Sequence, residues 1–191
     1  MKIILINGSP RSDGNTFHLL TMVKERVEMS GIETELIQLG GKQVHGCTAC
    51  MKCRNEGKGR CHIKNDRINE IIQKVREADG LVIGSPVYFA DVTSEVKALI
   101  DVLGYVARAD ASILRRKVGA SVIAVRRAGE IHAFNTINHL FLISEMIIPG
   151  SSYWNIALGR EKGDVLNDTE GVKTMETLGD NIAWLLKKCT N

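Results

Sequence analysis

The sequence predicts an α/β fold built on a doubly wound parallel sheet. Short apolar runs alternate along the chain with longer segments whose apolar residues recur at helical spacing. This alternation is typical of successive strand–helix–strand units, which form a parallel sheet with helices on both faces. The chain has 191 residues, of which 44% are apolar, so we expect a single domain over residues 1–191 with a sizeable core.

Five strands are expected, because five short apolar runs are bounded by turn residues. They are Lys2–Ile6, Thr34–Leu39, Gly80–Gly84, Val118–Val125 and Met146–Ile148. The second run is the most polar, which favours a place at a sheet edge, and Pro149-Gly150 interrupts the fifth. Five helices are expected from apolar residues at helical spacing. They cover Asn15–Met29, Ile68–Val75, Val96–Leu103, Ile131–Ser144 and Val172–Leu186.

Charge and hydropathy exclude several classes of function. The net charge is only +3 and no face of clustered Lys and Arg is evident, so we expect no nucleic-acid partner. No apolar run approaches the ~20 residues that a membrane span needs. The segment Met1–Ile6 runs directly into a strand without a secretory signal, which predicts a cytoplasmic protein. No acid–base dyad stands out, so we expect no catalytic side chain and a cofactor that carries the chemistry.

The loop after the first strand is rich in groups that bind phosphate. It supplies hydroxyls at Ser9, Ser12 and Thr16, an amide at Asn15 and one cation at Arg11. Backbone N–H groups in such a turn, together with the start of the next helix, attract an anion. The loop has neither a G-x-G-x-x-G pattern nor a Walker A lysine, which favours a phosphomonoester over NAD or ATP. The alternative is an ordinary polar turn that caps the helix.

Three stretches resemble the NADPH-dependent FMN reductase and flavodoxin-like superfamily. Gly8–Thr16 resembles its FMN phosphate loop, Gly84–Phe89 its second flavin loop, and Val96–Asp101 the helix that follows. The resemblance spans nearly the whole chain. It implies a flavodoxin-like five-stranded sheet of order 2-1-3-4-5 and FMN as the cofactor.

Two further loops are expected to contact the flavin ring. Pro86, Val87, Tyr88 and Phe89 offer aromatic contact and backbone donors, and two adjacent aromatic residues cannot both point into the core. The loop after the fourth strand contains Arg126, Arg127 and Gly129, and the resemblance implies that it reaches FMN. It departs from the glycine-rich version of many relatives. Either arginine could face the N1–O2 edge of the ring or lie on the surface.

Four cysteines fall within residues 45–64, a segment whose apolar residues follow neither helical nor strand spacing. Cys47, Cys50, Cys53 and Cys61 have the spacing C-x2-C-x2-C-x7-C, whereas Cys189 stands apart and is expected to have no role. Four thiolates suit an iron–sulfur cluster or zinc. Zinc ranks second, because structural zinc sites usually separate two C-x2-C turns by a longer segment. Free or cross-linked thiols are the third interpretation.

The compact cysteine motif resembles that of the iron–sulfur flavoproteins. The resemblance implies a 4Fe-4S cluster that serves the flavin of a neighbouring subunit. Because the cysteine segment follows the second strand, we expect it at the same carboxyl edge of the sheet as the phosphate loop.

The leading hypothesis is an FMN-dependent oxidoreductase, or electron-transfer flavoprotein, that couples FMN to the cluster. Ferredoxin or NAD(P)H is the expected electron donor and a quinone or oxygen the acceptor. The segments 94–108 and 131–154 carry more apolar residues than one sheet face needs, which predicts a homodimer or homotetramer. One alternative is a metal-free NAD(P)H-dependent FMN or quinone reductase of the same fold. A remote alternative is a zinc-stabilised binding module without flavin.

Overall fold

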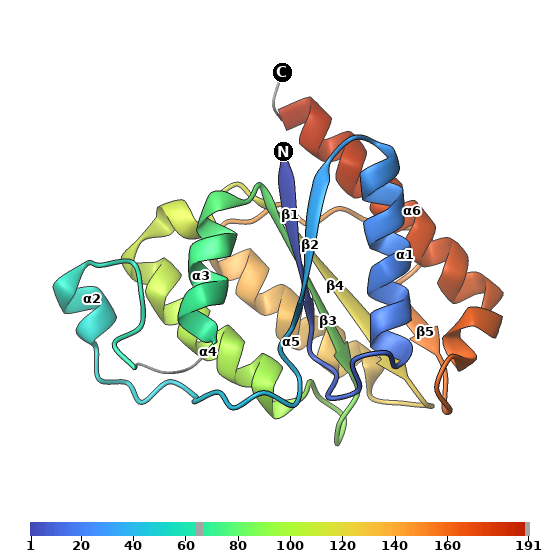
Figure 1. Cartoon of the computed structure of the whole chain (residues 1–191), viewed down its shortest axis with the longest axis horizontal. Helices are drawn as coiled ribbons and strands as arrows, with labels where there is room; N and C mark the ends of the chain where they lie inside the picture. Colours follow the sequence, from blue (N-terminus) through green and yellow to red (C-terminus); the bar gives the residue numbers. More distant parts are fainter. Residues whose placement is uncertain (64–66, 190–191) are drawn as a thin grey trace.

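A five-stranded parallel sheet forms the middle layer of the computed structural model, which describes residues 1–63 and 67–189 (Figure 1). The strand order is β2-β1-β3-β4-β5, which confirms the predicted order 2-1-3-4-5. The strands are β1 (Lys2–Asn7), β2 (Glu33–Gln38), β3 (Gly80–Pro86), β4 (Val118–Val125) and β5 (Ile156–Leu158). Lys64, the last residue of the predicted cysteine segment, lies outside the described residues.

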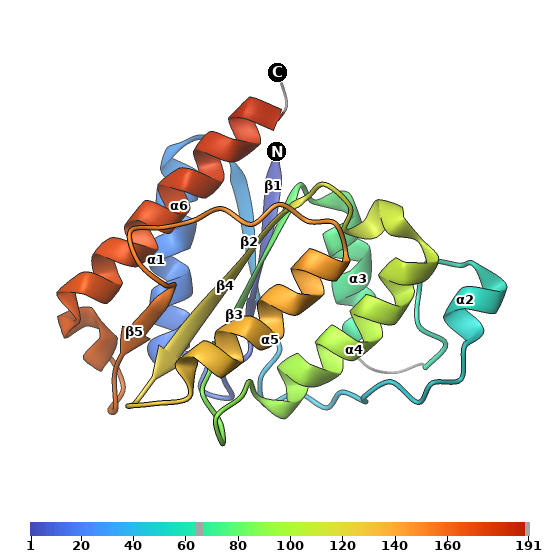
Figure 2. The same cartoon turned by 180° about the vertical axis from the view of Figure 1, so that it is seen from behind.

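Helices cover both faces of the sheet (Figure 2). One face of the sheet is covered by α1 (Asn15–Met29) and α6 (Thr169–Cys189). The opposite face is covered by α3 (Ile68–Glu77), α4 (Ser94–Ala109) and α5 (Glu130–Ile143). These are the five predicted helices. The structure adds α2 (Lys52–Glu56) within the cysteine segment and two 3-10 helices, η1 (Ala111–Ile113) and η2 (Asp164–Asn167). None of the helices in the described chain is both long and apolar enough to cross a bilayer.

The central strands are buried on both faces, which explains why they read as unbroken apolar runs. Successive side chains of a strand point to opposite faces. Ile4 and Ile6 of β1 therefore pack in the core layer under α3, α4 and α5, whereas Ile3 and Leu5 pack under α1 and α6. All four side chains are essentially inaccessible to solvent. The two layers hold the strand ends, and thus the loops that follow them, in fixed positions.

The fifth strand is not where the sequence analysis placed it. Within Met146–Ile148, Ile147 forms only an isolated bridge with Val118, at the beginning of β4. Pro149 has no N–H to continue the ladder, so the chain leaves the sheet there. It returns at Ile156–Leu158 and pairs with Ile123–Val125, at the other end of β4. This shift brings the segment after β5 to the carboxyl edge of the sheet, beside the phosphate loop.

Candidate cofactor site and cysteine loop

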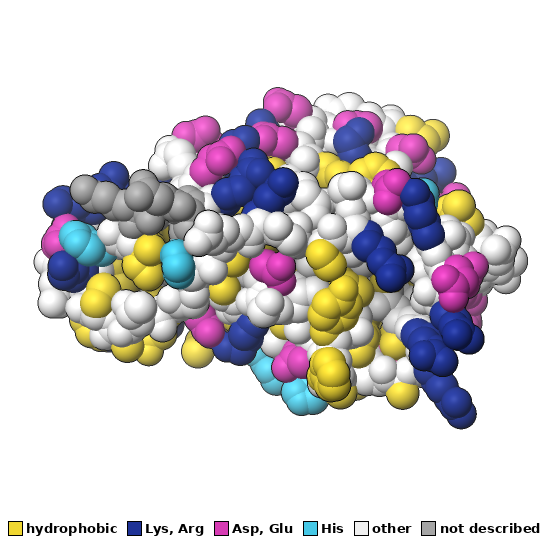
Figure 3. All heavy atoms as spheres, turned by 60° about the horizontal axis from the view of Figure 1, so that its bottom comes forward, with side chains coloured by type: hydrophobic (Ala, Val, Ile, Leu, Met, Phe, Trp, Pro, Cys, Tyr) yellow, Lys and Arg dark blue, Asp and Glu magenta, His cyan; other side chains and the backbone are white. Residues whose placement is uncertain are grey.

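A cavity of about 160 Å³ lies at the carboxyl edge of the sheet, where the loops after β1, β3, β4 and β5 meet. All three loops predicted to hold FMN contribute to it. Its lining consists of Ser9, Arg11, Asn15, Thr16, Pro86, Val87, Tyr88, Ala124, Arg126, Gly159 and Arg160. Four other predicted residues, Ser12, Phe89, Arg127 and Gly129, are not part of the lining. Figure 3 views the molecule toward this edge and shows Lys and Arg side chains on the right of the face as well as at its left end.

The phosphate loop is held in shape by its own polar groups. The N–H of Ser9 donates to Oδ1 of Asn7 (3.1 Å), and the N–H of Arg11 donates to Oγ of Ser9 (3.1 Å). Nε2 of Gln38, at the end of β2, donates to the carbonyl of Ser9 (2.7 Å). These bonds order the loop without a ligand, so little conformational entropy remains to be lost when an anion binds.

Thr16 provides the strongest sign that this loop accepts an anion. It is 1% exposed, and its Oγ1 has no hydrogen-bond partner among residues 1–63 and 67–189. It lies in the first turn of α1. The N-cap residue of this helix is Gly14, which has no side chain to cap the first N–H groups. The first N–H groups of a helix have no partner within the helix. A buried, unpaired hydroxyl is costly, and a phosphate oxygen placed here would accept from it and from these N–H groups.

Asn15 has a role that the sequence analysis did not anticipate. Its Nδ2 donates to the carbonyl of Glu161 (2.9 Å), and its Oδ1 accepts from the N–H of Gly163 (2.8 Å). The side chain thus ties the segment after β5 to the start of α1. Lys162 pairs with Asp13 across the same junction, and its hydrogen bond lowers the pKa of that carboxyl group. Because β5 was misplaced in the sequence analysis, no signal pointed to this segment.

The loop after β3 ends in a tight turn. Tyr88 and Asp91 exchange two backbone hydrogen bonds, of 2.7 and 3.0 Å. The two residues between them, Phe89 and Ala90, both have positive φ angles, of 47° and 64°. Phe89 is fully exposed and Tyr88 is 47% exposed. The expectation that at least one of the two aromatic residues lies outside the core is confirmed, since neither belongs to it.

The loop after β4 brings one arginine to the cavity. Arg126 lines it, whereas Arg127 does not. Gly129 follows with a φ angle of 92° and is the N-cap residue of α5. A side chain here would meet Val87 and Ala90 of the loop after β3. Gly129 therefore packs the loops after β3 and β4 together rather than lining the cavity.

The four clustered cysteines line a second, small cavity of about 20 Å³ against the second half of α4. Cys47, Cys53 and Cys61 are half-buried and Cys50 is exposed, while Cys189 lies exposed at the end of α6. A cavity of this volume holds about one water molecule. Among the residues that the structure describes, no three His, Cys, Asp or Glu side chains are arranged to hold a metal ion. A metal centre therefore needs the sulfur atoms to move toward one another.

The donor chemistry of this loop nevertheless suits a soft metal centre. All four thiols share one cavity, and the N–H of Ala49 donates to Sγ of Cys47 (3.4 Å). The pKa of the Cys50 thiol is lowered, chiefly by a hydrogen bond from the backbone N–H of Lys52. Ala49 and Met51 have positive φ angles, so the backbone changes direction on either side of Cys50. A set of four thiols around one cavity matches the ligands of iron–sulfur and zinc sites.

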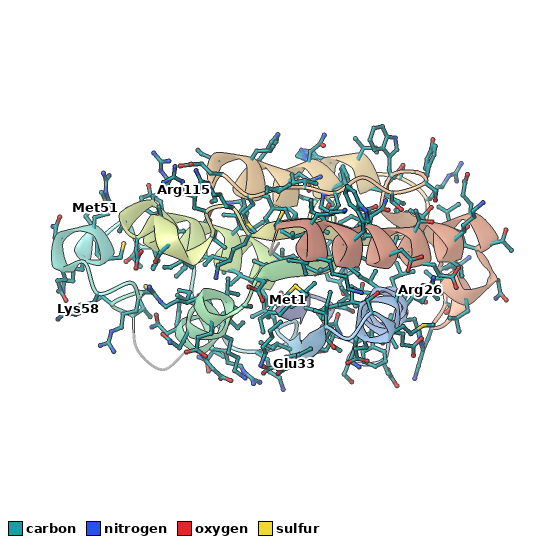
Figure 4. The ribbon with its side chains drawn as sticks, turned by 90° about the horizontal axis from the view of Figure 1, so that it is seen from above. Met1, Arg26, Glu33, Met51, Lys58 and Arg115 are labelled. Atoms are coloured by element: carbon teal, nitrogen blue, oxygen red, sulfur yellow. The ribbon has the colours of Figure 1, made fainter. Side chains whose placement is uncertain are left out.

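The cysteines do not lie at the carboxyl edge, contrary to the topological expectation. The segment starts there, and residues Lys42–Gly46 form a groove with the first half of α4. The cysteines pack farther along α4, against Val102, Tyr105 and Val106. Since α4 runs back from the edge and rises 1.5 Å per residue, they lie about 12–18 Å behind Ser94. Figure 4 places α2, marked by Met51 and Lys58, at one end of the molecule, far from α1 and Arg26.

Comparison with known proteins agrees with this geometry. The family model for NADPH-dependent FMN reductase matches residues 1–161. An iron–sulfur flavoprotein of Methanocaldococcus jannaschii is 38% identical over an alignment of 199 positions, gaps included, which covers 98% of each chain. An iron–sulfur flavoprotein of Methanosarcina thermophila is 30% identical, over 98% of this chain and 96% of the relative.

Solved structures of low sequence identity share the fold. RosB with a bound riboflavin-phosphate intermediate superposes with a TM-score of 0.76 at 19% identity, covering all of this chain and 80% of RosB. A flavodoxin from the domain Archaea superposes with a TM-score of 0.63 at 14% identity, covering 98% of this chain and 99% of the flavodoxin.

Proposed function

Because the chain belongs to the NADPH-dependent FMN reductase family, and is thus a flavin-dependent oxidoreductase, we propose that the cavity at the carboxyl edge is its FMN site. The phosphate would lie at Ser9–Thr16 and the ring between Tyr88 and Arg126. The observation that carries this assignment is the buried, unpaired hydroxyl of Thr16 at the uncapped start of α1. A phosphate there would satisfy a group that is otherwise costly to bury.

Each wall of the cavity has a separate task in this proposal. Thr16 and the first N–H groups of α1 hold the phosphate, and the exposed Arg11 adds charge. Tyr88 covers one part of the ring. Arg126 lies where positive charge would stabilise an anionic reduced ring. Bound FMN supplies hydride transfer and single-electron transfer, so no side chain needs to act as a catalytic acid or base.

We further propose that Cys47, Cys50, Cys53 and Cys61 hold a 4Fe-4S cluster. The support is the name shared by the relatives, the four-thiol donor set and the single cavity that all four side chains line. Zinc at the same four thiols is the alternative occupant. In this arrangement the cysteines are not beside the flavin site of their own chain, because they pack about 12–18 Å behind Ser94 along α4.

The flavin of a neighbouring subunit is the better partner for the cluster, which requires an oligomer. Apolar side chains exposed on α5 and the segment after it support one: Leu142 and Ile143 are 63% and 62% exposed, and Tyr153 and Trp154 are also exposed. A homodimer or homotetramer would cover them. Ferredoxin or NAD(P)H remains the proposed donor, with a quinone or oxygen as acceptor.

Anaerobic purification followed by spectroscopy and chemical analysis tests both parts of the proposal. We expect flavin absorbance together with about four irons and four acid-labile sulfides per chain. Cys53→Ser should lose the iron and keep the flavin, whereas the matched control Cys189→Ser should keep both. Flavin without iron after anaerobic reconstitution would overturn the cluster and leave the FMN site standing.

A metal-free NAD(P)H-dependent FMN or quinone reductase is the second candidate function. The open arrangement of the four thiols in the described chain favours it. It predicts rapid NAD(P)H oxidation that Cys50→Ser does not change. The zinc-stabilised module without flavin would instead show zinc by elemental analysis and no flavin absorbance.

A further inference from the structure

The side chain of Asn69 clamps the segment that carries the fourth cysteine. Its Oδ1 accepts from the N–H of Cys61 (2.8 Å). Its Nδ2 donates to the carbonyl of Cys61 (3.1 Å) and to the carbonyl of Ile63 (2.9 Å). One carboxamide thus holds the peptide groups on both sides of the Cys61 Cα atom. Fixing both peptide groups also fixes the direction of the Cα–Cβ bond, so that the thiol is confined to the few positions that its χ1 rotamers allow.

Asn69 is attached to a rigid element, whereas the cysteines are not. It lies in the first turn of α3, next to the fully buried Ile68 and one turn before the buried Ile71 and Ile72. The cysteine segment has only the short helix α2 as regular structure, and α2 buries no residue. The hydrogen bonds of the Asn69 carboxamide therefore fix a loop with little packing of its own to the well-packed helix α3.

Cys61 needs such a clamp more than the other three cysteines do. Cys47, Cys50 and Cys53 follow one another at intervals of three, on one continuous stretch of chain that ends within α2. Cys61 comes eight residues later, from a separate stretch. A second contact supports the same stretch: Arg76 of α3 donates to the carbonyl of Gly59 (3.0 Å) and pairs with Asp110 (2.7 Å).

We propose that Asn69 is a positioning residue that presents the thiol of Cys61 to a metal centre formed with the other three cysteines. This inference rests on the proposed cluster site and goes beyond it by assigning a role to a residue that is not a ligand. Without the clamp, three thiols would still gather while the fourth would be displaced. The centre would then change from four to three thiolate ligands, which is a spectroscopic change and not only a loss of stability.

Cobalt(II), a probe for tetrahedral thiolate sites, tests this inference independently of flavin and of activity. The reduced, metal-free chain of 191 residues is titrated with cobalt, and the thiolate-to-cobalt charge-transfer absorbance per bound metal reports how many thiolates coordinate. The variants are Asn69→Ala and Asn69→Asp. The latter keeps the acceptor for Cys61 N–H but turns a second oxygen toward the two carbonyls. Asn181→Ala is the matched control, because Asn181 also donates from a helix to a backbone carbonyl, that of Gly150 (2.8 Å).

We expect cobalt affinity to fall about 10–100-fold in both Asn69 variants, as for other residues that orient metal ligands. The charge-transfer intensity should fall to that of a Cys61→Ser chain, while Asn181→Ala should match the unmodified chain. Asn69 variants with unmodified affinity and intensity would overturn the role of Asn69 and leave the metal centre intact. An unmodified chain that neither binds cobalt at four thiolates nor takes up four irons on anaerobic reconstitution would overturn the metal centre itself and the inference with it.

Discussion

A Cβ atom on Gly129 would lie 2.8 Å from the Cα atom of Ala90, so the loops after β3 and β4 meet backbone to backbone at this point. Gly129 also has a φ angle of 92°, which side-chain-bearing residues rarely adopt. The contact joins the loop that carries Tyr88 to the loop that carries Arg126. The two ring-facing walls of the proposed FMN cavity therefore move as one unit.

Replacing Gly129 with alanine should disturb both loops together. We expect Gly129→Ala to lower the free energy of unfolding by roughly 1–3 kcal/mol, because the added methyl group meets Ala90 and φ is unfavourable. FMN affinity should fall as well, because the walls are pushed apart. Urea denaturation and flavin fluorescence titration measure the two effects. The control is Gly150→Ala, where an added Cβ meets no atom within 4 Å.

Ala90 itself carries strain that glycine would relieve. It is the second of two adjacent residues with positive φ, in a turn position where glycine or asparagine is preferred. We expect Ala90→Gly to raise the free energy of unfolding by about 0.5–1 kcal/mol. Ala128→Gly is the control, because Ala128 is exposed and does not have a positive φ angle. It should not raise the free energy of unfolding. A loss of stability in Ala90→Gly would show that the turn is not strained.

The hydroxyl of Thr16 should matter for the phosphate and not for the fold. We expect Thr16→Val to weaken FMN binding roughly ten- to hundredfold, because hydrogen bonds to charged groups contribute ~1.5–3 kcal/mol. Riboflavin, which has no phosphate, should bind equally to both chains. The flavin-free variant should be no less stable, because the hydroxyl has no partner to lose. Thr21→Val is the control on the same helix, since the Thr21 hydroxyl donates to the backbone carbonyl of Phe17 (2.9 Å) and does not face the phosphate loop.

The pairing of Arg76 with Asp110 should make the cysteine loop sensitive to acid. The hydroxyl of Ser112 and the guanidinium of Arg76 hold the pKa of Asp110 below its ordinary value of 3.8. The ionised carboxylate therefore contributes stability that is complete above this value and is lost as the pH falls through the lower pKa of the folded state. Asp110→Asn should lower the free energy of unfolding at neutral pH, and its difference from the unmodified chain should shrink below pH 3.8. Urea denaturation of both chains between neutral pH and about pH 3 measures this difference in the free energy of unfolding. A difference that does not change with pH would contradict the pairing.

The sequence was most informative where local chemistry alone determines structure. The apolar runs of β1, β3 and β4 and the hydroxyl-rich loop at Ser9–Thr16 needed no knowledge of distant contacts. The fifth strand was misplaced because two apolar stretches compete for the edge of β4. The local pattern showed that Pro149 interrupts the first stretch, but not that the second one pairs with β4 in its place. The contact of Asn15 with the segment after β5 was missed for the same reason.

The position of the cysteine loop could be predicted from the sequence only in part. Chain order correctly located the start of the loop at the carboxyl edge. It could not show how far the chain runs along α4 before Cys47 packs near Tyr105, because a segment without secondary structure has no fixed rise per residue. Nor could spacing reveal Asn69, whose only sequence signal is a polar residue in the first turn of α3.

The most direct test of the central claim is a titration of the flavin-free protein with FMN and with riboflavin, followed by flavin fluorescence. A phosphate held by Thr16 and the start of α1 predicts that FMN binds at least about a hundredfold more tightly than riboflavin, which corresponds to ~2.7 kcal/mol. Equal affinity for the two flavins, or no binding of FMN, would contradict the assignment of this cavity.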